Sequence, residues 1–204
     1  MNQNDNHNKI EIKIITLGDS KVGKSSLIVQ YLENKFSINY LSTIGFDFKR
    51  KQITLKDGTD VKLKIFDTAG QERYRSVADS YIKKANGILL VYDITEKQSF
   101  KNIENWLESI REEMGDKLLP IILVGNKSDL KDERKIPTEE GKKKAEEYGF
   151  HFYETSCKTG ENVNKCFTEL AELIYEKTGK KPLQNVNQKL KNDSHKEKKK
   201  KRCC

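Results

Sequence analysis

Apolar runs bounded by turn residues alternate with segments of helical periodicity along most of the chain. Val61, Leu63 and Ile65 alternate with polar residues, which is typical of a strand with one buried face. Asp57-Gly58 lies just before this run and predicts a tight hairpin turn. Other runs are continuously apolar, as in strands that helices cover on both sides. The pattern predicts strands at 10–17, 46–55, 61–66, 87–94, 120–125 and 150–155.

Helices fit between these strands. Trp106, Leu107 and Ile110 form one apolar stripe at helical spacing, and residues 167–174 contain a second. A strand, a helix, a hairpin and repeated helix–strand units predict an α/β fold. We expect a six-stranded, mostly parallel sheet with one antiparallel edge strand and helices on both faces.

Length and charge define the domain organisation. The 204 residues suffice for one domain, which we place at residues 9–178. Residues 1–8 are polar, and residues 179–204 have low hydrophobicity and high charge, so both ends are expected to be disordered. The whole net charge of +8 lies in residues 180–204, which contain ten Lys or Arg and two acidic residues. A neutral body argues against a nucleic-acid partner, and the basic tail indicates an anionic membrane surface.

The cysteines and the apolar runs indicate the compartment. Cys157 and Cys166 lie within the domain, and Cys203 and Cys204 end the chain, so the four form no disulfide framework. A reducing, cytoplasmic location follows. The longest apolar stretches are far shorter than the roughly 20 residues that span a bilayer.

Residues 18–25 fit the pattern G-x-x-x-x-G-K-[ST] between the first strand and an apolar helix. Gly18 and Gly23 allow the backbone N–H groups to face a phosphate, and the helix adds its positive dipole end. Lys24 would then reach the β- and γ-phosphates, and the Ser25 hydroxyl would bind Mg²⁺. The loop predicts a triphosphate site, which kinases, ATPases and GTPases all use. The predicted contacts are Gly18, Ser20, Lys21, Val22, Gly23, Lys24, Ser25 and Ser26.

A second motif, Asn126-Lys127-Ser128-Asp129, follows the fifth strand, at the carboxyl edge where open α/β sheets bind ligands. The Asp129 carboxylate can accept from both N1–H and the 2-amino group of guanine, which adenine lacks. Residues 155–158 follow the sixth strand and could donate backbone N–H groups to guanine O6. The predicted base contacts are Asn126, Lys127, Asp129, Ser156, Cys157 and Lys158. Asp67, at the end of the third strand, places a carboxylate near Mg²⁺, and Gln71 follows it.

These motifs, each at a strand end, resemble the Ras superfamily of small GTPases and within it the Rab family, over residues 9–178. Residues 44–48, 62–66, 73–77 and 90–95 are similar to Rab sequences, and Cys203-Cys204 resembles their doubly geranylgeranylated end. The resemblance implies a GTP-hydrolysing switch of vesicle trafficking that cycles between an inactive GDP state and an active, membrane-attached GTP state. It implies a lipid anchor on the cytosolic face of membranes.

The resemblance also assigns roles to further residues. Phe36 would stack on guanine, and Thr43 would contact both Mg²⁺ and the γ-phosphate. Asp67 would hold the metal through a water, Gly70 would donate its N–H to the γ-phosphate, and Gln71 would orient the attacking water. The expected partners of this monomer are an exchange factor, a GTPase-activating protein, a GDP-dissociation inhibitor or escort protein, and effectors that bind Phe48, Phe66 and Tyr81.

Several positions depart from the Rab pattern, among them residues 81–85, which differ from the usual Tyr-Tyr-Arg-Gly-Ala. Lys21 replaces a small residue and either adds a cation near the phosphates or points to solvent, the interpretation we favour. Cys157 replaces Ala, and Phe66 replaces Trp. Two other classes share the phosphate loop, a GTP-binding interaction module without useful turnover and a P-loop kinase. Gln71 and Thr43 argue against the first class, and the guanine motif argues against the second.

Overall fold

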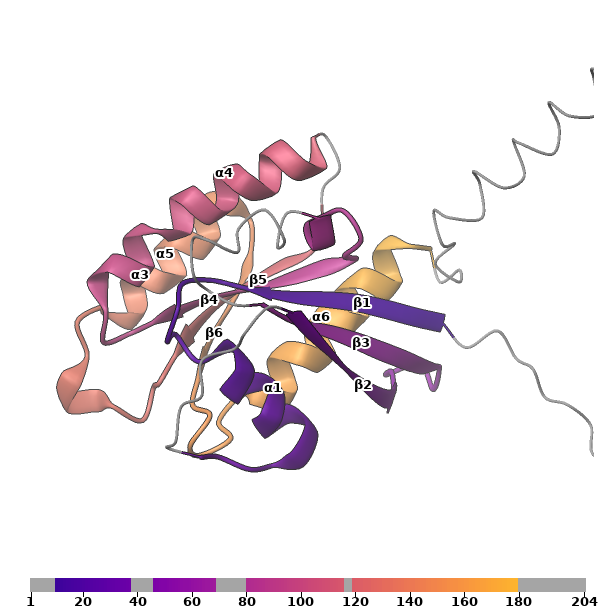
Figure 1. The fold of residues 1–204 in the computed structure, drawn as a ribbon, viewed down its shortest axis with the longest axis horizontal. Helices are drawn as coiled ribbons and strands as arrows, with labels where there is room; N and C mark the ends of the chain where they lie inside the picture. Colours follow the sequence, from indigo (N-terminus) through magenta and orange to yellow (C-terminus); the bar gives the residue numbers. More distant parts are fainter. Residues whose placement is uncertain (1–9, 38–45, 69–79, 116–118, 180–204) are drawn as a thin grey trace, which may run out of the picture.

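A computed structural model describes residues 10–37, 46–68, 80–115 and 119–179, and these form one six-stranded sheet flanked by helices (Figure 1). The sheet order is β2-β3-β1-β4-β5-β6. Strand β2 pairs antiparallel with β3, and every other pair is parallel. The predicted α/β class, including its antiparallel edge strand, is confirmed. The strands are β1 (Ile10–Leu17), β2 (Phe46–Thr54), β3 (Asp60–Thr68), β4 (Gly87–Asp93), β5 (Ile121–Asn126) and β6 (His151–Thr155).

Helices cover both faces of the sheet, as the repeated helix–strand units predict. One face carries α1 and α6, and the other carries α3, α4 and α5 (Figure 1). A short 3-10 helix, η2, follows β5. The helices are α1 (Lys24–Glu33), α3 (Lys97–Lys101), α4 (Ile103–Met114), η2 (Lys131–Glu133), α5 (Thr138–Tyr148) and α6 (Val163–Lys177). None of the described helices combines the length and the apolar character needed to cross a bilayer.

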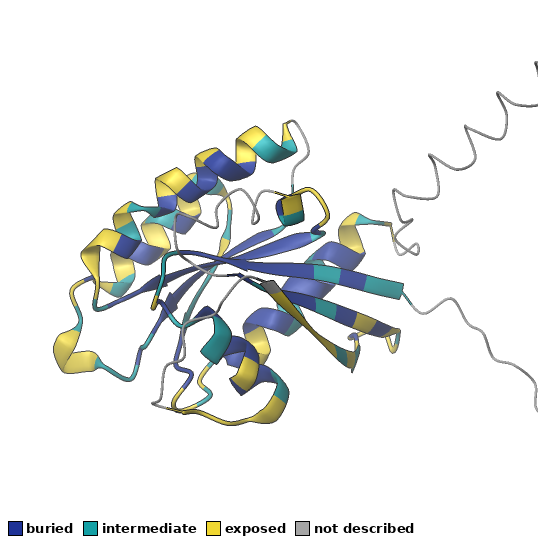
Figure 2. Ribbon diagram, in the orientation of Figure 1, coloured by how far each residue is buried: buried dark blue, intermediate teal, exposed yellow. Residues whose placement is uncertain are grey.

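The sheet separates two apolar cores because its strands alternate their side chains between the faces. In β1, Ile12 and Ile14 pack toward α1 and α6, whereas Ile15 and Leu17 pack toward α4 and α5. The central strands are therefore almost wholly buried, and the exposed positions gather on β2 and on the outer sides of the helices (Figure 2). Trp106 of α4 lies in the second core and is 8% exposed.

The parallel strands place their carboxyl ends at a single edge. The predicted hairpin turn between β2 and β3 lies at the opposite edge, with Gly58 at φ 85° and its N–H donated to Leu55 O at 3.0 Å. Strand β3 continues past the predicted end at residue 66, because Thr68 Oγ1 donates to Thr16 O at 2.7 Å and fastens it to β1. Asp67 therefore lies beside the loop that follows β1.

Candidate nucleotide site

The loop between β1 and α1 needs both of its motif glycines. Gly18 has φ 136°, and a Cβ there would lie 2.1 Å from Val91 O. Gly23 has φ 99°, and a Cβ there would lie 2.3 Å from Asn126 Nδ2. Any side chain at either position would collide with groups that fix the loop, so the loop holds its shape only with glycine.

Lys24 begins α1 and is 5% exposed. Its Nζ donates to Gly18 O at 2.8 Å and to Asp19 O at 2.7 Å, so the ammonium lies inside the curve of the loop. Burial lowers the pKa of Lys24 to about 8, although the charges of Asp67 and Asp19 act in the opposite direction. A buried cation inside a ring of backbone groups fits a polyphosphate, because an anion offsets the cost of its desolvation.

Asp67 and Ser25 place side-chain oxygen atoms near this ammonium. Burial raises the pKa of Asp67, and a hydrogen bond with the Ser25 side chain and the charge of Lys24 lower it in part. Oδ1 of Asp67 is buried and has no hydrogen-bond partner in the described part of the chain. An unpartnered carboxylate oxygen beside a hydroxyl fits a hard divalent cation such as Mg²⁺, which prefers oxygen ligands.

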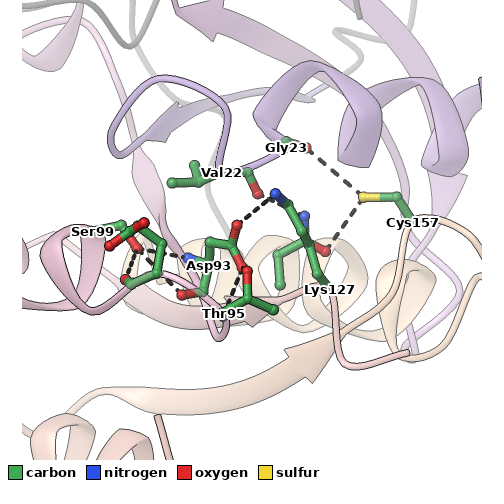
Figure 3. A network of polar contacts seen from close by, with 9 residues as sticks. Val22, Gly23, Asp93, Thr95, Ser99, Lys127 and Cys157 are labelled. Atoms are coloured by element: carbon green, nitrogen blue, oxygen red, sulfur yellow. Dashed lines mark hydrogen bonds and ion pairs between the residues drawn. The ribbon is translucent and has the colours of Figure 1, made fainter. Parts of the chain in front are cut away.

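Asn126 connects three motifs from the centre of the site. Its side chain is 1% exposed, and Nδ2 donates to Val22 O of the phosphate loop at 2.8 Å. Oδ1 accepts from Thr155 Oγ1 at 3.1 Å, and Cys157 Sγ lies 3.4 Å from the same oxygen. Cys157 Sγ also lies 3.8 Å from Gly23 O (Figure 3). Burial raises the pKa of Cys157 to about 11, so its thiol stays protonated at neutral pH. The phosphate loop and the two predicted base-binding loops therefore form one unit.

The carboxylate predicted to read guanine is held in place. Ser156 Oγ donates to Asp129 Oδ1 at 2.6 Å and accepts the N–H groups of Lys158 at 3.2 Å and Thr159 at 3.1 Å. These bonds fix the orientation of Asp129 before any base arrives. Such preorganisation increases the penalty for a base that lacks the matching donors.

Lys127 occupies a strained backbone position with φ 69°. Its Nζ lies 2.5 Å from Oδ2 of Asp93, at the end of β4 (Figure 3). Oδ1 of Asp93 accepts from Thr95 N at 2.8 Å and Thr95 Oγ1 at 2.7 Å. The motif therefore joins the neighbouring strand end through Asp93, a residue that the sequence analysis did not assign to the site.

Some of the remaining predicted site residues lie within the described part of the chain, and others lie outside it. Lys21 is exposed at φ 65°, which agrees with the solvent-facing interpretation, and Phe36 is 43% exposed at the end of a described segment. Ser20 and Ser26 are half-buried in and after the loop. Thr43, Gly70, Gln71, Cys203 and Cys204 lie outside the described residues.

The predicted aromatic face does come together. The rings of Phe48 and Phe66 have centroids 6.4 Å apart, and those of Phe66 and Tyr81 are 5.1 Å apart. Phe48 is 41% exposed, with Arg50 and Lys64 over its ring at 4.7 and 4.2 Å. Phe48 is therefore the exposed ring of this cluster, whereas Phe66 is 4% exposed and Tyr81 is half-buried.

Asp19 of the phosphate loop makes side-chain contacts with α4 that the sequence did not predict. Its carboxylate accepts from Asn102 Nδ2 at 2.7 Å and from Trp106 Nε1 at 2.9 Å. Helical spacing had assigned Trp106 to the core alone. The available signal was the indole N–H, because a buried tryptophan usually finds an acceptor for it.

A parallel sheet with a glycine-lined loop, a buried lysine and a preorganised carboxylate at its carboxyl edge defines a P-loop nucleotide-binding protein. The family model described as the Ras family matches residues 13–176. The chain is 43% identical over 175 residues to the Ras-related protein Rab-13 of Bos taurus, covering 86% of this chain and 85% of that one. It is 46% identical over 164 residues to RABE1e of Arabidopsis thaliana, covering 80% and 74%. It is 43% identical over 175 residues to SEC4 of Saccharomyces cerevisiae, covering 86% and 80%.

The chain therefore belongs to the Ras family and is a Rab small GTPase. It is a GTP-hydrolysing switch of vesicle trafficking.

Proposed function

We propose that the described edge of the sheet binds GTP and GDP with an Mg²⁺ ion, and that each motif handles one part of the nucleotide. Lys24 and the loop N–H groups bind the phosphates, and Asp129 selects guanine. Ser25 and Asp67 hold Mg²⁺, which supplies charge neutralisation on the phosphates when bound. The carrying observation is Asn126, whose hydrogen bonds join the phosphate loop to the base-binding loops.

Hydrolysis in this proposal depends on Gln71, which orients the attacking water, while Thr43 and Gly70 contact the γ-phosphate. Phosphoryl transfer requires positioning and charge stabilisation rather than covalent chemistry. In this proposal no arginine of this chain stabilises the charge on the reacting phosphate. Hydrolysis without a partner should therefore be slow. An arginine from an activating protein would accelerate it by about 10³ to 10⁵.

The switch acts through partners and a membrane. The GTP form would order the segments around Thr43 and Gly70 and engage effectors through Phe48, Phe66 and Tyr81. An exchange factor would reload GTP, and a GDP-dissociation inhibitor or escort protein would carry the lipidated GDP form. Cys203 and Cys204 would carry the lipids that attach the active form to the cytosolic face of a membrane.

The bound nucleotide tests the site directly. The full chain is purified and denatured, and the released nucleotide is identified by chromatography. We expect GDP or GTP at close to one molecule per chain. An adenine nucleotide would overturn the role of Asp129, and a chain that neither retains nor takes up guanine nucleotide would overturn the site.

Base selection gives a sharper prediction at Asp129. Asp129→Asn replaces an acceptor that faces the guanine 2-amino group with an amide that can donate. Xanthine carries an acceptor at that position, so the variant should lose guanine affinity by a factor of about 10² or more and gain xanthine affinity. Competition of GDP and XDP against a fluorescent nucleotide measures both changes. The exposed Asp132→Asn is the matched control, and equal losses for both bases would contradict base reading by Asp129.

Gln71→Leu tests the hydrolytic role. Leucine is similar in size but cannot orient a water, so stimulated hydrolysis should fall by about 10² or more while GTP binding persists. Single-turnover phosphate release with and without an activating protein measures this. Stimulated hydrolysis at the wild-type rate would refute the role given to Gln71.

A further inference from the structure

The phosphate loop is tied to the helical layer through one side chain. Asp19 follows Gly18, and its two carboxylate oxygens accept from Asn102 and Trp106, 83 and 87 residues further along the chain. Asn102 immediately precedes α4, and Trp106 lies in its first turn. The two donors are four residues apart, so they lie on the same helical face.

The donors are themselves fixed. Gln98 Nε2 donates to Asn102 Oδ1 at 2.8 Å, which turns the amide nitrogen of Asn102 toward Asp19. Trp106 N donates to Asn102 O at 3.1 Å, which fixes the spacing of the two residues. The indole ring is 8% exposed and packs in the core between the sheet and α4. Asp19 is therefore held by groups that have little freedom to follow it.

The same aspartate reaches the phosphate lysine through its backbone. Asp19 O accepts from Lys24 Nζ at 2.7 Å, and the charge of Asp19 raises the pKa of Lys24 against the effect of burial. An anchored Asp19 keeps this carbonyl in place and keeps its own negative charge bonded to α4. An unanchored Asp19 would place a mobile negative charge within the loop that receives a polyphosphate.

We infer that Asn102 and Trp106 are positioning residues for nucleotide retention, acting on the phosphate loop through Asp19. The inference rests on the proposed nucleotide site and adds the helix α4 to the three loops that form it. Without the donors, the loop should release nucleotide faster, because it loses charge-assisted hydrogen bonds that fix its shape. The expected acceleration is about tenfold, as for the loss of one such bond.

A double-mutant cycle on the full chain separates this role from packing. Trp106→Phe removes the indole N–H and keeps an aromatic ring, and Asp19→Ala removes the acceptor. Release of a fluorescent GDP analogue is measured for both variants, the double variant and the wild type. Trp106→Phe should accelerate release about tenfold with Asp19 present and have little effect in the Asp19→Ala background. Equal effects in both backgrounds, or no effect in either, would overturn the inference.

A second variant, at Asn102, tests the same role in case Trp106→Phe disturbs the fold. Asn102→Ala should also accelerate release only when Asp19 is present, whereas Asn164→Ala, the same change at an exposed position of α6, should not. If Asn102→Ala and Asn164→Ala behave alike, the positioning role is wrong. A wild-type chain that binds no guanine nucleotide would overturn the proposed function instead.

The hydrogen bond between Trp106 and Asp19 can also be tested without nucleotide. Trp106 is the chain's single tryptophan, so fluorescence excited at wavelengths that tyrosine does not absorb reports this residue alone. Asp19→Ala should shift its emission because the indole N–H loses its acceptor, and the exposed Asp132→Ala should leave the spectrum unchanged. An unshifted spectrum in Asp19→Ala would show that the bond does not form.

Discussion

Two side chains at the nucleotide site are held where burial disfavours their charges. Burial lowers the pKa of Lys24 to about 8 and raises the pKa of Asp67. Each charge partly compensates the other, but Oδ1 of Asp67 still lacks a hydrogen-bond partner within the described residues. In the proposed site, a polyphosphate beside Lys24 and a divalent cation beside Asp67 would stabilise these two charges, and this stabilisation would contribute to the binding free energy of the nucleotide.

The lowered pKa of Lys24 gives a pH prediction for the nucleotide-free protein. Between pH 8 and 10.5 the unfolded chain keeps the Lys24 proton and the folded chain loses it, so the unfolding free energy rises with pH. Lys24→Met lacks this titration. From pH 7.5 to 10.5 the unfolding free energy of the wild type should rise by about 3 kcal/mol relative to that of Lys24→Met.

Urea unfolding of the nucleotide-free proteins at these two pH values measures the gain. Lys177→Met, at an exposed lysine of α6, is the control and should show no comparable change relative to the wild type. A difference between wild type and Lys24→Met that stays constant with pH would contradict the burial of the Lys24 charge.

At the scale of elements, α5 approaches the sheet closely because Gly141 has no side chain. A Cβ at this position would lie 2.4 Å from the Tyr92 hydroxyl oxygen and 2.6 Å from the Phe152 ring. The Tyr92 hydroxyl is buried without a hydrogen-bond partner in the described residues, and burial raises its pKa. Glycine has a lower helix propensity than alanine, but here it allows α5 to pack directly against the Tyr92 and Phe152 rings.

Gly141→Ala tests this packing. Alanine at a helical position ordinarily stabilises by about 1 kcal/mol relative to glycine, but overpacking costs about 1 to 3 kcal/mol. The steric effect should prevail and lower the unfolding free energy by up to about 2 kcal/mol. Urea unfolding measures the change, with Lys142→Ala at the exposed neighbouring position as the control. A stabilised Gly141→Ala variant would show that α5 moves away without cost.

Sequence periodicity predicted the elements well because burial on one or both faces determines the apolar pattern. The motifs at strand ends were equally readable, since parallel strands bring their carboxyl ends to one edge. Side-chain pairs distant in sequence were not readable. Neither the Lys127–Asp93 ion pair nor the bonds of Asp19 to α4 leave a periodic signal, because each depends on the geometry of one rotamer. Such pairs determine how rigid the site is, so the structure was needed to find them.

At the scale of the whole molecule, α6 runs across the sheet from one edge to the other. The helix begins near the carboxyl edge of the sheet and ends at the opposite edge (Figure 1). Its last turns contact the β2–β3 hairpin, where Glu172 Oε1 accepts from Lys56 N at 2.7 Å and Tyr175 Oη lies 3.1 Å from Thr59 Oγ1. The described part of the chain therefore ends at the edge opposite the nucleotide site.

The two terminal cysteines are the proposed lipid anchor of the protein. Two lipid chains, or one chain with a polybasic patch, hold a protein stably on a membrane, and each basic residue near an anionic leaflet contributes about 1 kcal/mol. Replacing both Cys203 and Cys204 by Ser should leave only the cations of residues 198–202 and move the protein to the soluble fraction of cells. Changing those five cations to Gln while keeping both cysteines should leave the protein on membranes, because two lipid chains suffice. Membrane association that survives the loss of both cysteines would refute lipid anchoring at Cys203 and Cys204, and guanine nucleotide binding should be unchanged in both variants.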